Sequence, residues 1–144
     1  MKLKDLPVDE FTTHFAESLN ITNTAEDINH FFETKKVRHI PVVEDNKVIG
    51  IISERDFYKY LALKSQENNK VVLKEIQVNE IMTERPYTVF SSESLKTVAF
   101  EMSKNKIGSA IVLDSDGNSI GIFTTTDALN ALVEVLRSEQ GLFI

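Results

Sequence analysis

The sequence repeats itself, and this repeat limits the possible folds more than any other feature. At an offset of 70 residues, Val8–Thr13 aligns with Val78–Thr83, and three of the six positions are identical. After one inserted residue, Ile49-Gly50-Ile51 aligns with Ile120-Gly121-Ile122. The chain is therefore predicted to contain two copies of a unit of roughly 60 residues.

The repeat also predicts the domain organisation. We expect repeat 1 at residues 8–63, a linker at 64–77, repeat 2 at 78–137 and a C-terminal tail at 138–144. The linker is expected to open with a connecting loop, because Lys64–Lys70 is polar and lacks apolar periodicity. A unit of about 60 residues buries too little surface to be stable alone, so the two copies are expected to share a core.

Apolar residues recur at helical spacing near the start of each copy and predict one amphipathic helix per repeat. They are Ala25, Ile28 and Phe32 in repeat 1, and Leu95, Val98, Ala99 and Met102 in repeat 2. A second helix is predicted at the end of each copy. In repeat 2 its buried stripe is expected to consist of Leu129, Leu132, Val133 and Leu136.

Two stretches rich in isoleucine and valine follow the first helix of each copy, and the turn residues between them predict a hairpin. These stretches are His39–Val43 with Val48–Ile52, and Ser109–Leu113 with Ile120–Phe123. Short extended segments are expected before the first helices, at Ser18–Leu19 and Thr88–Val89. The resulting order, β-α-β-β-α in each repeat, predicts a mixed α/β (α+β) fold.

Charge and composition exclude several classes of function. A net charge of −6 gives no electrostatic basis for binding nucleic acid or an anionic membrane. The chain has no cysteine, and its three histidines (His14, His30 and His39) lack the spacing of a zinc helix, so no metal site is predicted. It has no apolar run of even 10 residues and no apolar signal core in Met1–Asp9, so a cytoplasmic protein is expected.

Both copies pass from their last strand into their last helix through the same corner. In Gly50–Asp56 and Gly121–Asp127, a glycine and two apolar residues precede a hydroxyl residue, and an aspartate follows three positions later. One interpretation is structural, since this spacing is similar to a helix capping box. The other is functional, because helix N-termini attract anions and a nearby carboxylate can accept both hydroxyls of a ribose.

These residues resemble a tandem pair of CBS (cystathionine-β-synthase) domains. The resemblance rests on the two corners, on Val37–Val43 in repeat 1, and on Ile81-Met82-Thr83 with Arg85–Val89 in repeat 2, and it covers residues 8–137. It implies a Bateman module, in which two βαββα repeats are related by a pseudo-twofold axis. The two clefts between such repeats often bind adenosine-containing ligands.

The resemblance also implies a role for particular residues. Asp56 and Asp127 would bind ribose hydroxyls, and Ser53 and Thr124 would contact phosphate or ribose. The residues expected to line the adenine slot, mainly through their backbone, are Ile40, Pro41, Thr88, Val89, Ala110 and Ile111.

The two corners differ in chemistry. His39 and Arg55 are candidates to contact a phosphate tail at the Asp56 corner. His39 is equally a half-buried strand residue, and an arginine in the first turn of a helix, such as Arg55, more often points into solvent. The Asp127 corner has hydroxyls and amides but no cation nearby in sequence. One corner is therefore expected to bind a charged nucleotide, while the other stays empty or takes a neutral adenosine moiety.

The expected function is that of a regulatory module that senses AMP, ADP or ATP, ahead of S-adenosylmethionine or NAD, with no obligatory cofactor. The alternative is a nucleotide-free interaction or dimerisation domain. The sequence has no nucleophile elbow, P-loop, GxGxxG or HExxH motif, so no enzyme activity is expected. The resemblance also implies a homodimer formed through the helices, and a separate regulated protein is a further expected partner. The apolar run Gly141–Ile144 is expected to pack on the module or across such an interface.

Overall fold

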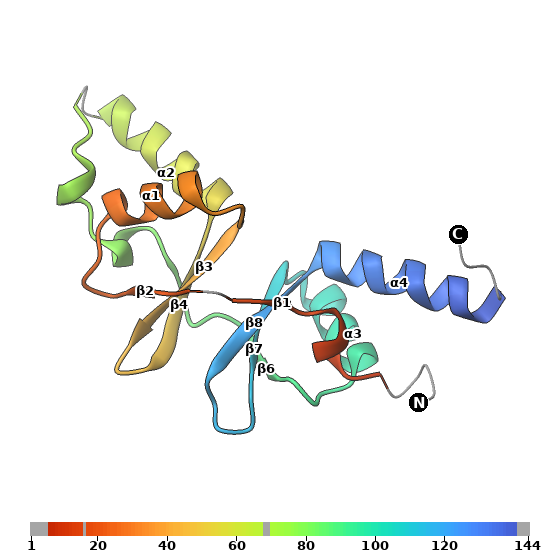
Figure 1. Ribbon diagram of the computed structural model, residues 1–144. Helices are drawn as coiled ribbons and strands as arrows, with labels where there is room; N and C mark the ends of the chain where they lie inside the picture. The colour runs from red at the N-terminus through yellow and green to blue at the C-terminus, as the bar shows by residue number, and fades with distance from the viewer. Residues whose placement is uncertain (1–5, 16, 68–69, 141–144) are drawn as a thin grey trace. The chain divides into compact units, whose positions relative to one another are not determined.

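The computed structural model describes residues 6–15, 17–67 and 70–140, and its helices and strands are labelled in Figure 1. The chain divides into two compact units. The first-repeat unit comprises residues 16–86, and the second-repeat unit comprises residues 1–15 together with 87–144. Each unit contains one four-stranded sheet. Within the described ranges, no helix is long and apolar enough to cross a membrane.

The first-repeat unit has the strand order β2-β3-β4-β5, in which β2 is parallel to β3 and the other pairs are antiparallel. Its elements are β2 (Leu19–Asn20), α1 (Ala25–Thr34), β3 (His39–Glu44), β4 (Lys47–Ser53), α2 (Glu54–Glu67), the short 3-10 helices η3 (Leu73–Glu75) and η4 (Val78–Glu80), and β5 (Thr83–Glu84). A reciprocal pair of hydrogen bonds between Thr24 and Asp27 caps the start of α1. The apolar face of α1 (Ala25, Ile28 and Phe32) is buried in the core of the unit.

The second-repeat unit has the corresponding order β1-β8-β7-β6, with β6 parallel to β7. Its elements are η2 (Val8–Phe11), β1 (Thr13–His14), β6 (Thr88–Phe90), α3 (Leu95–Asn105), β7 (Ser109–Leu113), β8 (Ser119–Thr124) and α4 (Thr125–Gln140). Ser94 caps α3 by accepting a hydrogen bond from the Thr97 amide. Val98 and Met102 of this helix are buried against Phe123 of β8 and other core residues.

Each sheet is completed by a short strand that lies outside its own repeat. β1 lies near the start of repeat 1 but pairs with β8 of repeat 2 (Figure 1). In this pairing Thr13 is opposite Ile122. β5 opens repeat 2 but pairs with β4 of repeat 1, where Thr83 is opposite Ile51. Each sheet therefore depends on a segment from the start of the other repeat.

The glycine of each corner motif allows this exchanged strand to approach. A Cβ atom on Gly121 would lie 2.5 Å from the carbonyl oxygen of Thr13 and 3.0 Å from the Cα atom of His14. A Cβ atom on Gly50 would lie 2.5 Å from the sulfur of Met82 and 3.0 Å from the carbonyl oxygen of Thr83. At Gly121 a side chain would push the backbone of the exchanged strand away, whereas at Gly50 it would first displace the flexible side chain of Met82.

The structure confirms the predicted first helices and hairpins, but it corrects the predicted connecting loop. The predicted loop begins at Lys64, whereas helix α2 continues as far as Glu67. Tyr60 and Leu61 of α2 pack against the core, as do Val71 and Leu73 from the second half of the predicted linker. The exchanged strands β1 and β5 were not predicted, because two-residue strands carry no periodic signal. The repeat boundaries stay a prediction.

The predicted buried stripe of α4 is wrong. Its members are exposed, with 63% of Leu129, 52% of Leu132, 44% of Val133 and 45% of Leu136 accessible to solvent. Ala131, which is only 3% exposed, faces the unit instead. The prediction failed because α4 carries apolar residues around more than one face, and the smaller ones pack inward. The run Gly141–Ile144 lies outside the described residues.

Candidate functional site: two strand-to-helix corners

At the Asp127 corner, other groups of the chain donate hydrogen bonds to the carboxylate. The Oδ2 atom of Asp127 accepts hydrogen bonds from the Thr124 amide at 2.9 Å and from the Thr124 hydroxyl at 3.0 Å. In return, the Asp127 amide donates to the Thr124 Oγ1 atom at 3.3 Å. The hydroxyl of Thr13, on the exchanged strand β1, donates to the Oδ1 atom of Asp127 at 3.3 Å. This corner is a complete capping box with one additional donor.

At the Asp56 corner, only half of that arrangement is present. The Asp56 amide donates to the Ser53 Oγ atom at 3.0 Å, so Ser53 caps α2. Across the part of the chain that the structure describes, no group donates a hydrogen bond to the Asp56 carboxylate, and the residue is exposed. Thr83 has the same register position as Thr13, but no hydrogen bond joins it to Asp56. The Asp56 carboxylate is therefore open to solvent.

The two corners also differ in the charge of their neighbours. Arg38 lies beside the Asp56 corner, because its carbonyl oxygen accepts a hydrogen bond from the Glu54 amide at 2.8 Å. Arg55 is in the first turn of α2. Both arginines are exposed, and neither forms an ion pair with a residue of the described ranges. The equivalent positions in the second-repeat unit are Gly108 and Thr126, which carry no charge.

The residues expected to contact adenine lie on the strands next to the corners. Ile40 and Pro41 are buried in β3, and Ala110 and Ile111 are buried in β7, so their side chains belong to the cores. In β6, Thr88 is exposed opposite Ile111 and Val89 is buried. His39 is half-buried and is opposite Ser53 in the β3–β4 pairing. Only the backbone of the buried strands and the Thr88 side chain are left to face a ligand.

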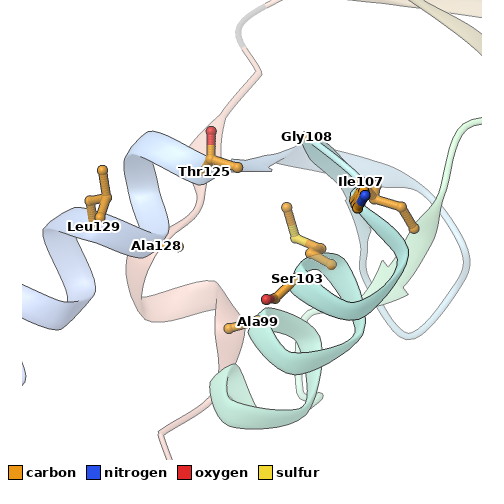
Figure 2. A pocket seen from close by; sticks show the side chains of 9 residues that line it. Ala99, Ser103, Ile107, Gly108, Thr125, Ala128 and Leu129 are labelled. Atoms are coloured by element: carbon orange, nitrogen blue, oxygen red, sulfur yellow. The ribbon is translucent and has the colours of Figure 1, made fainter.

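A groove between α3 and α4 was not anticipated from the sequence. It has a volume of about 500 Å³ and is mainly apolar. Figure 2 shows Ala128 and Leu129 of α4 across from Ala99 and Ser103 of α3. Thr125 of the corner lines the groove, but Thr124 and Asp127 do not, so the groove does not include the side chains expected to bind a ligand.

No metal site accompanies the corners within the part of the chain described. There, no three histidine, aspartate or glutamate side chains are grouped closely enough to hold a metal ion. The two corners present hydroxyls, helix N-terminal amides and carboxylates, and the Asp56 corner also has guanidinium groups beside it. These groups suit a ligand that carries both a vicinal diol and an anionic part.

A comparison with known protein families shows to which family a chain with these two corners belongs. The CBS domain matches twice, at residues 7–63 and 78–134. The chain belongs to the CBS-domain family. Its tandem CBS repeats form the arrangement known as a Bateman module. A CBS domain-containing protein from Dictyostelium discoideum is 30% identical over 127 residues, which cover 83% of this chain and 86% of that protein.

Solved structures of other CBS pairs have the same fold. AcuB from Vibrio cholerae is 30% identical with a TM-score of 0.72, and the match covers 94% of this chain and 96% of that one. CBSX2, solved in complex with AMP, is 25% identical with a TM-score of 0.69, covering 91% and 98% of the two chains. These likenesses support a regulatory CBS module.

Two longer relatives have the name of an enzyme. Homoserine O-acetyltransferases from Methanococcus vannielii and Methanohalobium evestigatum are 30% and 29% identical to this CBS pair. The chain spans only 19% and 24% of their lengths. The enzyme name describes those longer proteins, and the similarity does not transfer their activity to this chain.

Proposed function

We propose that this CBS pair is a regulatory module that binds an adenosine-containing ligand at its strand-to-helix corners, with AMP, ADP or ATP as the first candidates. The observation that carries the proposal is the Asp56 carboxylate, which is exposed and receives no donor from the described part of the chain. A carboxylate at a helix N-terminus is stabilised by the positive end of the helix dipole, and it usually accepts hydrogen bonds from backbone amides. One left open there is available to a ligand.

Each group at the Asp56 corner has a task in this proposal. Asp56 accepts the two ribose hydroxyls, and the N-terminal amides of α2 face the phosphate. Arg38 and Arg55 supply the positive charge that an anionic tail requires, since guanidinium groups bind phosphate oxygens well. The backbone of Ile40 and Pro41 faces the adenine ring. In the second-repeat unit the corresponding groups are Thr124 and Asp127, with Thr88, Val89, Ala110 and Ile111 beside adenine.

Regulation requires that the ligand bind one conformation of the module better than another. Because none of the proposed contacts positions a nucleophile or a general base, the module is proposed to signal rather than to catalyse. The signal would pass to a separate protein or to the assembly of the module itself.

Thermal unfolding tests this proposal with AMP, ADP, ATP, S-adenosylmethionine and NAD, and with GTP as a control. A ligand at 100 times its dissociation constant stabilises a protein by roughly 2.7 kcal/mol, which is easily detected. We expect a selective shift with one adenosine ligand, and its reduction in Asp56→Ala. Asp116→Ala, which removes an exposed acid from a turn, is the matched control. Either no shift with any ligand, or an unchanged shift in Asp56→Ala, contradicts the proposal.

A second function, self-association, is favoured by the exposed apolar face of α4 in the second-repeat unit. Leu129, Leu132, Val133 and Leu136 of α4 and Phe100 of α3 are all exposed. Four of the five equivalents in the first-repeat unit are smaller or more polar, namely Tyr58, Ala62, Ser65 and His30. The fifth, Leu61, is a leucine as well, but it packs against the core of its unit. Large exposed apolar patches mark interaction sites. We propose that this face forms the homodimer.

Light scattering coupled to gel filtration tests this second proposal. The wild-type protein is expected to elute with the mass of a dimer, and Leu132→Asp with the mass of a monomer and an unchanged circular dichroism spectrum. Leu63→Asp, at an exposed position of α2, is the matched control. A wild-type protein that is monomeric at tens of micromolar contradicts the dimer.

A further inference from the structure

The Asp127 carboxylate has little capacity left for a ligand. An ionised carboxylate offers about four acceptor positions. At Asp127, three donors already use them: the Thr124 amide, the Thr124 hydroxyl and the Thr13 hydroxyl. A ribose diol brings two hydroxyl donors, so both cannot be accepted unless one existing donor leaves. At Asp56, by contrast, no described group donates to the carboxylate.

Of the three donors, Thr13 supplies the one that comes from outside the corner motif. The Thr124 contacts are made within the corner motif, whereas Thr13 comes from the exchanged strand β1. Its position is constrained, because it pairs with Ile122 and its carbonyl oxygen packs closely on Gly121. Thr83 has the equivalent position against β4 but makes no contact with Asp56. Equivalent threonines therefore have different effects.

We propose that Thr13 is a specificity-determining residue: its hydroxyl occupies the Oδ1 atom of Asp127 and weakens this corner for a ribose diol, so the Asp56 corner binds adenosine ligands more tightly. The inference rests on the proposed function, and it adds which corner is stronger and why. Thr13 acts by competition, as a donor supplied by the chain in place of a ligand hydroxyl.

Calorimetric titration with AMP and with ATP tests this inference, using variants that leave one corner intact. In an Asp56→Asn background, Thr13→Val keeps the shape of the side chain but removes the donor. Because one hydrogen bond contributes about 0.5–1.5 kcal/mol, we expect roughly a two- to tenfold gain in affinity at the Asp127 corner. Thr13→Ser, which restores a hydroxyl, should bring the affinity back. The matched control, Thr83→Val in an Asp127→Asn background, should leave affinity unchanged.

The outcomes separate this inference from the proposed function. If the wild-type protein binds AMP or ATP but Thr13→Val leaves affinity at the Asp127 corner unchanged or lowers it, Thr13 does not compete and the inference is overturned while the function stands. If no variant binds either nucleotide, the proposed function fails and the inference falls with it. Thermal unfolding of each variant without ligand checks folding. A double-mutant cycle between Thr13→Val and Asp127→Asn measures the contact itself.

Discussion

The Asp56 and Asp127 corners have the same motif and the same backbone path, yet only one of them is closed by the chain. At Asp127, Thr124 and Thr13 supply hydrogen bonds to the carboxylate. At Asp56, the hydroxyl cap is present but the carboxylate is open, with Arg38 and Arg55 nearby. The comparison shows that the same motif caps a helix at both corners but leaves its aspartate available to a ligand at only one of them.

The largest expected difference between the two units concerns their glycines. Gly121→Ala places a methyl group against the backbone of Thr13 and His14, whereas Gly50→Ala meets chiefly the flexible side chain of Met82. We expect a loss of about 2–4 kcal/mol for Gly121→Ala and about half of that for Gly50→Ala. Urea denaturation measures both.

Gly108→Ala is the control for these variants, because nothing lies within 4 Å of the added methyl group. Equal losses for Gly121→Ala and Gly50→Ala would show that the two exchanged strands are held in the same way, contrary to the structure.

The next difference is in the caps. Thr124→Ala removes one acceptor and one donor of the capping box, so it should destabilise the protein by about 1–2 kcal/mol. Ser53→Ala removes a single acceptor, and about 0.5–1 kcal/mol is expected. Chemical denaturation of the two variants checks the order. A larger loss for Ser53→Ala would reverse the comparison.

The aspartates should differ in the same direction. Asp127→Ala leaves three donors without their acceptor, and we expect a loss of about 1 kcal/mol in the absence of ligand. Asp56→Ala breaks no described side-chain contact and should lie within about 0.5 kcal/mol of the wild type. Comparable losses, measured by thermal unfolding without nucleotide, would mean that Asp56 is also a structural cap.

The smallest expected effect concerns the hairpin turn of the second-repeat unit. Asp114 accepts hydrogen bonds from the amides of Asn118 and Asp116, both at 2.9 Å, and the bond from Asn118 contributes most to lowering the pKa of its carboxyl below 3.8. A lowered pKa in the folded state stabilises the protein above the unfolded value, and this stability is lost as pH falls through the folded value. Asp114→Ala should therefore flatten the acid limb of the stability curve slightly. An unchanged limb in a pH series of thermal unfolding would contradict this.

Much of the fold follows from patterns that the sequence carries locally. The helices at Ala25 and Leu95 and the two hairpins follow from apolar periodicity and turn residues, and the structure has them. The exchange of β1 and β5 does not follow, because pairing of such short strands is decided by space at Gly121 and Gly50 rather than by propensity. The outward face of α4 was also missed, since periodicity shows that a helix has apolar residues but not what covers them.

The corners were found from the sequence because both copies repeat the same spacing. Their inequality was only partly foreseen. The sequence predicted that His39 and Arg55 set one corner apart, but the contact from Thr13 to Asp127 joins residues 114 positions apart. The local sequence pattern does not show which of Thr13 and Thr83 contacts an aspartate, because that depends on where each side chain lies in the folded structure.

The most direct test of the account follows the backbone amides of both corners by NMR while AMP is added. The account predicts that the amides of Glu54 and Asp56 shift at a lower AMP concentration than those of Thr125 and Asp127. If the amides at Asp127 respond first, or if neither corner responds, the central claim that the open Asp56 corner is the principal ligand site is wrong.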